Sequence, residues 1–135
     1  MDVETAFLNS VLEEDLFVKL PRGVEYAGTT CAKLLKVVYG LKQAGKEWLE
    51  TSDAFIMGYD ERRQRSDVEP CLYYIRDFGL TVIILAYVDD YLVATDDEAW
   101  YNNFVAAFNS EYACKDLGVL DLVMGIGVRW GPGVA

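Results

Sequence analysis

Residues 80–94 carry the pattern that most restricts the fold of this chain. The apolar run Leu80–Tyr87 is followed by "VDD" and then by the apolar run Tyr91–Ala94. We expect these runs to pair as an antiparallel hairpin with Asp89 and Asp90 at its tip, and an apolar strand of this kind to be covered on both faces. Two aspartates at a tip have two interpretations, an ordinary turn or a metal site, and the metal site needs a third carboxylate from elsewhere in the chain.

The rest of the pattern predicts a small α+β domain over residues 1–135. Strands are expected at 16–23 and Cys71–Arg76, and two short ones within 112–128. One helix is expected from Gln43 to about Met57 with Gly58 as its stop, and another after a capping box formed by Thr95 and Glu98. The order β-β-α-β-β-β-α-β-β predicts an antiparallel sheet with two helices packed on one face.

Composition restricts the chemistry. The chain has no histidine, and its three scattered cysteines (Cys31, Cys71 and Cys114) lack metal-ligand spacing, so carboxylates, lysines or tyrosines must carry any reaction. The net charge of −10 argues against a polynucleotide partner, and the basic cluster at residues 60–67 is interpreted as a solvated loop. Neither a signal peptide nor a membrane-spanning run is expected, which indicates an intracellular chain.

A third carboxylate stands at the start of the chain, within "MDVETAFLNSVLEEDLFVKLPRG". This segment resembles the reverse transcriptase of copia-type LTR retrotransposons. The resemblance continues through "KLLKVVYGLKQAGKEW", "SDVEPCLYY", "ILAYVDDYLVA" and "KDLGVLDLVMGIGV". The "YGLKQA" and "YVDD" blocks are individually specific, so the resemblance favours a metal site over a turn at Asp89 and Asp90.

The resemblance implies a polymerase palm that carries out RNA-directed DNA polymerisation with two Mg²⁺ ions, a template-primer and deoxynucleoside triphosphates. It implies that Asp2, Asp89 and Asp90 are the catalytic metal ligands, with Asp90 the more peripheral. For Lys115, protonation of pyrophosphate and a plain exposed lysine remain alternatives. The other implied residues are Phe7 as steric gate, Gln43 at the nucleotide, Tyr87 at the primer terminus, and Met124 and Gly125 as primer grip.

The resemblance leaves two hypotheses of different class. The chain is expected to be a palm truncated at both ends, without fingers, thumb or RNase H. The first hypothesis is a catalytic palm fragment, and the second is a decayed or repurposed palm that acts as a non-catalytic binding or structural module. We expect weak or absent nucleic-acid binding, and self-association through an edge strand left unpaired before Asp2. A third hypothesis, independent of the resemblance, is an unrelated carboxylate metal hydrolase.

Overall fold

The structure is a computed structural model that describes residues 1–24, 28–123 and 125–129. The chain forms two compact units. One unit comprises Met1–Glu4 together with the chain from Arg62 onward, and the other comprises Thr5–Glu61. Each unit is described by itself.

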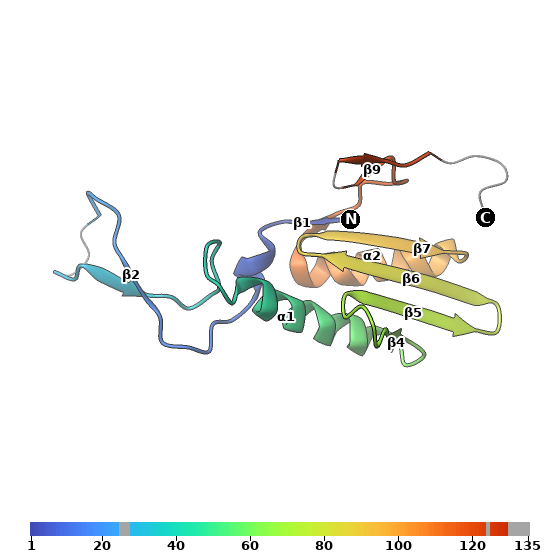
Figure 1. Cartoon of the computed structure of the whole chain (residues 1–135), viewed down its shortest axis with the longest axis horizontal. Helices are drawn as coiled ribbons and strands as arrows, with labels where there is room; N and C mark the ends of the chain where they lie inside the picture. Colours follow the sequence, from blue (N-terminus) through green and yellow to red (C-terminus); the bar gives the residue numbers. More distant parts are fainter. Residues whose placement is uncertain (25–27, 124, 130–135) are drawn as a thin grey trace. The chain divides into compact units, whose positions relative to one another are not determined.

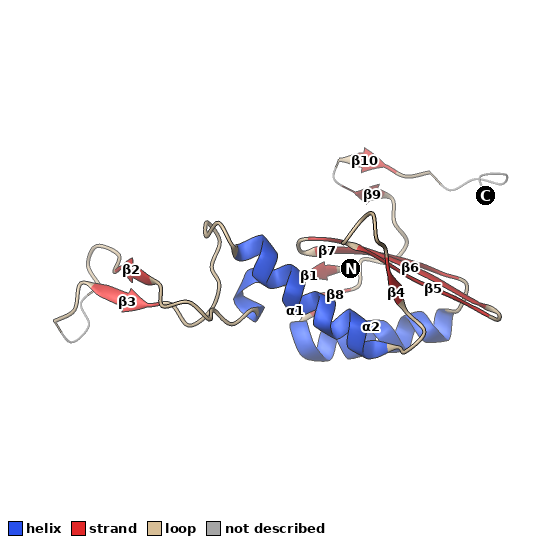
Figure 2. Ribbon diagram, turned by 60° about the horizontal axis from the view of Figure 1, so that its bottom comes forward, coloured by secondary structure: helices blue, strands red, loops and turns tan. Residues whose placement is uncertain are grey.

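The first unit is built on a six-stranded antiparallel sheet of order β4-β5-β6-β7-β1-β8 (Figures 1 and 2). The predicted hairpin forms its centre, because β6 pairs with β7 from Tyr87↔Asp90 to Val82↔Thr95. The strands are β1 (Asp2–Val3), β4 (Gln64–Arg65), β5 (Leu72–Asp77), β6 (Leu80–Tyr87), β7 (Asp90–Thr95) and β8 (Cys114–Lys115).

Strand β1 is an interior strand of this sheet. It pairs with β7 on one side and with β8 on the other, so the prediction of an unpaired edge at the start of the chain is wrong. The edges are instead β4 and β8, each two residues long. Such short edges offer few free backbone groups to another strand.

The central strand β6 is covered on one face, and the prediction of cover on both faces is wrong. Burial alternates along it, with Val82 and Ile84 buried and Ile83 and Leu85 exposed. An antiparallel sheet can pack one face and leave the other open, and β-branched side chains suit strands on either face. The unbroken apolar run of this strand therefore did not indicate burial on both faces of the sheet.

Helix α2 (Glu98–Tyr112) packs against β7 and β8 (Figure 2). Its N-cap is Asp97, whose carboxylate accepts the Trp100 N–H at 2.9 Å, so the predicted capping box at Thr95 is wrong. The Thr95 hydroxyl instead accepts the Asp97 N–H at 3.1 Å, and thus supports the cap. On this helix Phe104 and Phe108 are fully buried and belong to the core.

The second unit contains a 3₁₀ helix η1 (Ala6–Asn9), the strands β2 (Phe17–Lys19) and β3 (Cys31–Lys33), and helix α1 (Ala44–Tyr59). Helix α1 continues past Gly58 to Tyr59, so the predicted stop is two residues early, and the backbone becomes extended at Asp60. A small core of Leu12, Val37 and Ala44 lies between these elements. The Ser10 hydroxyl is buried, and it donates to the Glu47 carbonyl at 3.2 Å, which connects the residue after η1 to α1.

The strands β9 (Leu122–Val123) and β10 (Ile126–Gly127) form a separate two-stranded hairpin. Among the described residues, no helix has both the length and the apolar character required to cross a membrane.

Candidate functional site

The turn between β6 and β7 consists of two residues, Val88 and Asp89. Val88 has φ of +53°, whereas Asp89 has no positive φ, which is the pattern of a type II′ turn. Glycine normally occupies the first position of such a turn, and a β-branched side chain there is strained. Asp89 thus lies at the tip as predicted, while Asp90 is already the first residue of β7 and pairs with Tyr87.

The register of β1 brings Asp2 beside these residues. Met1 and Tyr91 exchange two hydrogen bonds, of 2.8 and 2.9 Å, and the Val3 N–H donates to the Asp89 carbonyl at 2.8 Å. Asp2 and Asp90 therefore form the non-hydrogen-bonded pair between them. In such a pair the Cα atoms are about 4.5 Å apart and the side chains leave the same face of the sheet.

The local charge at this pair is unfavourable without a cation. The pKa of Asp90 is raised, first by burial and then by the negative charges of Asp89 and Asp2, while the N-terminal ammonium acts in the opposite direction. Like charges directly opposite each other destabilise a sheet, and a bound cation relieves that cost. Carboxylate oxygens are also the ligands that Mg²⁺ prefers, so the donor set fits this ion.

The chemistry of these carboxylates suits Mg²⁺, but the arrangement of the side chains does not. Across the described part of the chain, no three side chains of the Asp, Glu, Cys or His type are gathered closely enough to hold a metal ion. The backbone thus brings Asp2, Asp89 and Asp90 together, but their carboxylates are not arranged as a ligand cage.

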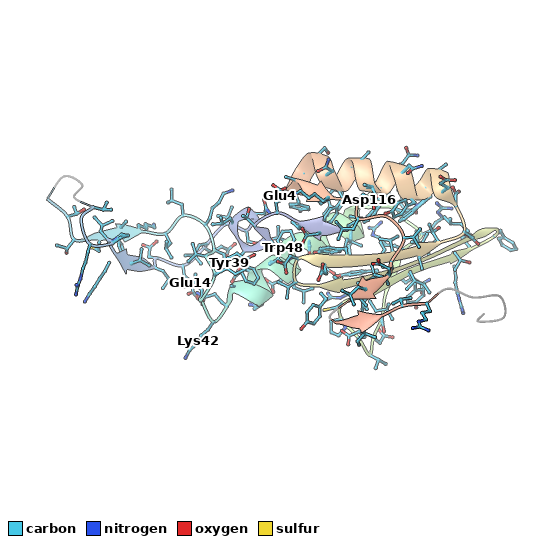
Figure 3. All side chains as sticks on the ribbon, turned by 90° about the horizontal axis from the view of Figure 1, so that it is seen from above. Glu4, Glu14, Tyr39, Lys42, Trp48 and Asp116 are labelled. Atoms are coloured by element: carbon cyan, nitrogen blue, oxygen red, sulfur yellow. The ribbon has the colours of Figure 1, made fainter. Side chains whose placement is uncertain are left out.

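Lys115 lies on the other side of Asp2, as its cross-strand partner in β8. Its ammonium nitrogen is 2.7 Å from a carboxylate oxygen of Glu4, and this hydrogen bond raises the pKa of Lys115 and lowers that of Glu4. Sequence reasoning missed Glu4 (labelled in Figure 3), although its spacing of two from Asp2 was a signal for the same face of an extended segment.

The residue after Lys115, Asp116, is fixed by two hydrogen bonds that the sequence did not suggest. Its Oδ1 atom accepts the Tyr101 hydroxyl at 2.8 Å and the Gly118 N–H at 2.9 Å. Burial, followed by the hydrogen bond to Asp116, raises the pKa of Tyr101 to about 12. Helix α2 is thereby connected to the segment that carries Lys115.

The two predicted nucleotide residues of the second unit have local partners. Phe7 is half-buried, and its ring lies 4.5 Å from that of Tyr39 between centroids. Gln43 is the N-terminal boundary of α1, and its amide donates to Glu14 at 3.2 Å. Figure 3 labels Tyr39 and Glu14.

The predicted primer residues are placed as follows. Tyr87 is 51% exposed and shares a face with its cross-strand partner Asp90. Gly125 has φ of +79° and lies between β9 and β10, in a turn that suits glycine. Met124 lies outside the described residues.

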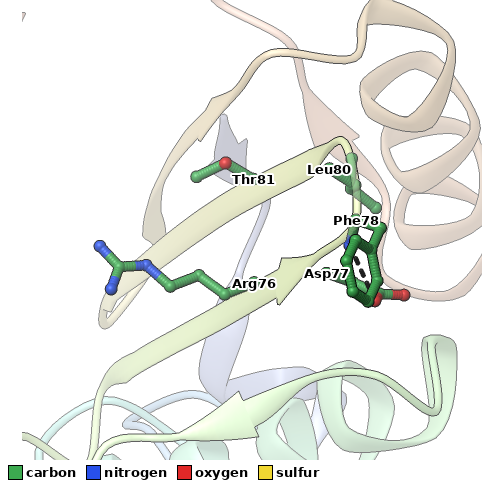
Figure 4. A pocket seen from close by; sticks show the side chains of 5 residues that line it. All are labelled: Arg76, Asp77, Phe78, Leu80 and Thr81. Atoms are coloured by element: carbon green, nitrogen blue, oxygen red, sulfur yellow. Dashed lines mark hydrogen bonds between the residues drawn. The ribbon is translucent and has the colours of Figure 1, made fainter.

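A depression of about 270 Å³ lies at the opposite end of β6 from Asp89 (Figure 4). It is lined by Arg76, Asp77, Phe78, Leu80 and Thr81. The Asp77 side chain accepts the Phe78 N–H at 2.8 Å, at the turn between β5 and β6. None of the predicted site residues lines this depression, so it is not part of the predicted site.

Comparison with known proteins agrees with the resemblance. The profile of the reverse transcriptase (RNA-dependent DNA polymerase) family matches residues 1–134. The chain is 35% identical over 129 residues to the retrovirus-related Pol polyprotein from transposon TNT 1-94 of Nicotiana tabacum, which covers 93% of the chain and 10% of the polyprotein. No solved structure matches the chain significantly.

Two further relatives are a transposon Ty5-1 protein of Saccharomyces cerevisiae and the Pol polyprotein from transposon RE1 of Arabidopsis thaliana. The first is 34% identical over 133 residues, 96% of the chain and 42% of the relative. The second is 28% identical over 135 residues, 98% of the chain and 9% of the relative. The chain thus spans less than half the length of each, and the resemblance to copia-type retrotransposons is confirmed. The chain belongs to the reverse transcriptase (RNA-dependent DNA polymerase) family.

Proposed function

We propose that this chain is the palm of a copia-type reverse transcriptase, and that Asp2, Asp89 and Asp90 hold the divalent ions of RNA-directed DNA polymerisation. The observation that supports this most is the non-hydrogen-bonded pairing of Asp2 with Asp90, beside a turn that presents Asp89. Asp2 is far in sequence from Asp89 and Asp90, and the pairing of β1 with β7 brings its backbone beside theirs in a member of the family.

When bound, two divalent ions would stabilise the attacking and leaving oxygens of phosphoryl transfer. The side chains around the proposed ion site have roles of their own. Tyr87 offers an exposed ring beside Asp90 for the primer end. The Nζ atom of Lys115, kept protonated by Glu4, is the proton donor available to a pyrophosphate leaving group.

The residues of the second unit have proposed roles in nucleotide selection. The half-buried ring of Phe7, supported by Tyr39, would exclude a ribose 2′-hydroxyl. The amide of Gln43, oriented by Glu14, would contact the nucleotide. Gly125, and Met124 beside it in sequence, are proposed to hold the primer strand.

A second candidate function is a decayed palm that binds without catalysis. The observation that favours it is the absence, among the described residues, of three side chains arranged to hold a metal. The net charge of −10 also favours it, since most nucleic-acid affinity comes from phosphate contacts.

The experiment measures thermal unfolding of the wild type with and without Mg²⁺, together with extension of a primed RNA template. Mg²⁺ is expected to raise the melting temperature of the wild type but not of Asp89→Asn. Asp67→Asn is the control for lost charge, because Asp67 is exposed in a loop and no described residue bonds its side chain. An equal Mg²⁺ response in all three proteins would contradict the proposed metal site.

Extension, where it is observed, separates the two candidates. For the purified chain we expect no measurable extension. Template-dependent extension that is present in the wild type and lost in Asp89→Asn would reject the decayed palm, whereas extension that survives this substitution would indicate a contaminating polymerase.

A further inference from the structure

The charges of this acidic chain are strongly segregated. Residues 16–46 contain six basic residues and one acidic residue, while the remainder contains six basic and 21 acidic residues. The six basic side chains are all exposed: Lys19, Arg22, Lys33, Lys36, Lys42 and Lys46. The net charge of −10 is therefore the sum of one basic segment and a strongly acidic remainder. The basic segment lies in the second unit.

The strands β2 and β3 place part of this charge on one face. The register pairs Phe17 with Lys33 and Lys19 with Cys31, so the ring of Phe17 and the ammonium groups of Lys19 and Lys33 leave the same side of the hairpin. Phe17 is 62% exposed. Among the described residues the hairpin pairs with no third strand, and it extends away from α1 within this unit (Figures 1 and 2).

Most of the basic groups are available to a ligand. Within the described residues, no acidic side chain forms an ion pair with Lys19, Arg22, Lys36 or Lys42. Lys33 contacts Asp15 at 2.5 Å, with side chains 47% and 74% exposed. An exposed pair of this kind contributes little to stability, so a phosphate can displace Asp15 at small cost.

We infer that the β2–β3 hairpin is a binding surface for single-stranded nucleic acid. Lys19 and Lys33 contact successive phosphates, and a base stacks on Phe17 between them. An exposed aromatic ring among cations is the arrangement that binds single strands without sequence preference. The cations alone would fit an acidic protein segment equally well, for example an acidic segment of a second copy of this chain. The exposed ring of Phe17 favours nucleic acid, because a base can stack on it.

This inference deepens the proposed function by adding a substrate contact far in sequence from Asp89. It rests on the proposed function only for the expectation that the chain encounters nucleic acid. Binding at the hairpin needs no metal, so an experiment can reject the hairpin surface without rejecting the proposed metal site, and the reverse.

The test is fluorescence anisotropy with a labelled 12-nucleotide oligo(dT) and a single-stranded RNA of the same length, in EDTA and over a series of salt concentrations. The wild type is expected to bind at low salt, and the affinity is expected to fall as salt rises. The Lys19→Gln/Lys33→Gln double variant should lower the magnitude of the salt slope by about 1.4, since each single-strand phosphate contact contributes about 0.7. Phe17→Ala should weaken binding by roughly fivefold or more and leave the slope unchanged.

The matched control is Arg62→Gln/Arg65→Gln, which removes the same charge from the basic cluster of the other unit. This control is expected to bind like the wild type. Equal loss in the control and in the hairpin variant, or no binding at low salt, would overturn the inference. A salt-sensitive oligomer that the hairpin variant abolishes, without oligonucleotide binding, would assign the surface to a second copy instead. If Asp89→Asn binds the oligonucleotides like the wild type, the hairpin acts independently of the carboxylates.

Discussion

At the scale of single residues, the carboxylates of Asp2 and Asp90 stand opposite each other in two paired strands. Such a pair costs stability in the absence of a cation. The strained φ of Val88 adds a second local cost at the same turn. Both costs are concentrated where the proposed function needs Asp89 and Asp90.

The first prediction concerns Asp90. Asp90→Asn removes one of the two like charges, so we expect the free energy of unfolding to rise by about 0.5 kcal/mol at neutral pH without divalent ions. Urea unfolding measures this change, with Asp67→Asn as the charge control. Because the folded-state pKa of Asp90 is raised, the contribution of the aspartate favours folding at low pH and is lost as the pH rises through that pKa. The advantage of the variant should therefore vanish below about pH 4, and a variant less stable than the wild type at neutral pH would contradict the account.

The second prediction concerns Tyr101, whose hydroxyl donates to Asp116. Tyr101→Phe should lower the free energy of unfolding by about 1 kcal/mol at neutral pH. The pKa of Asp116 is lowered, by the Gly118 N–H first and also by the Tyr101 hydroxyl. The stability from this group is thus present above its unfolded pKa and is lost as the pH falls through the lowered folded pKa. Equal loss at pH 7 and at pH 2 would show that packing, and not this hydrogen bond, is responsible.

At the scale of secondary structure, the hairpin of β6 and β7 was predictable and the partners of β1 were not. Two apolar runs separated by a short polar turn specify a hairpin locally. A strand of two residues, Asp2–Val3, has no periodicity to detect, and its place between β7 and β8 depends on contacts distant in sequence. The cap of α2 was misplaced by two residues because Thr95 and Asp97 are both good N-caps, and only the structure shows which carries the bond.

The third prediction concerns that cap. Asp97→Ala should lower the free energy of unfolding by about 1 kcal/mol, because the Trp100 N–H loses its acceptor. Asp97→Asn retains a side-chain acceptor and is the matched control, expected to lose much less. Chemical denaturation measures both, and equal loss in the two variants would mean that charge at the helix start, not the hydrogen bond, is what Asp97 supplies.

At the scale of the whole molecule, total charge was a poor guide, because it averaged a basic segment with a much more acidic remainder. The resemblance indicated the catalytic residues, but the side-chain arrangement could not be read from the sequence, since carboxylate positions depend on the packing of β1, β6 and β7. Self-association stays a prediction. The exposed apolar face that includes Ile83 and Leu85 is a more extensive surface for it than either two-residue edge, and sedimentation at high concentration will show whether the chain is monomeric.

The central claim is that Asp2, Asp89 and Asp90 form one cation site. Paramagnetic Mn²⁺ broadens the NMR signals of nearby amides, so a titration of the ¹⁵N-labelled chain locates bound ions directly. We expect broadening at low Mn²⁺ to be confined to residues 1–4 and 87–91 together with Lys115, and to disappear in Asp89→Asn. Broadening centred instead on the acidic start of α2, at residues 96–98, or unchanged in Asp89→Asn, would contradict the claim.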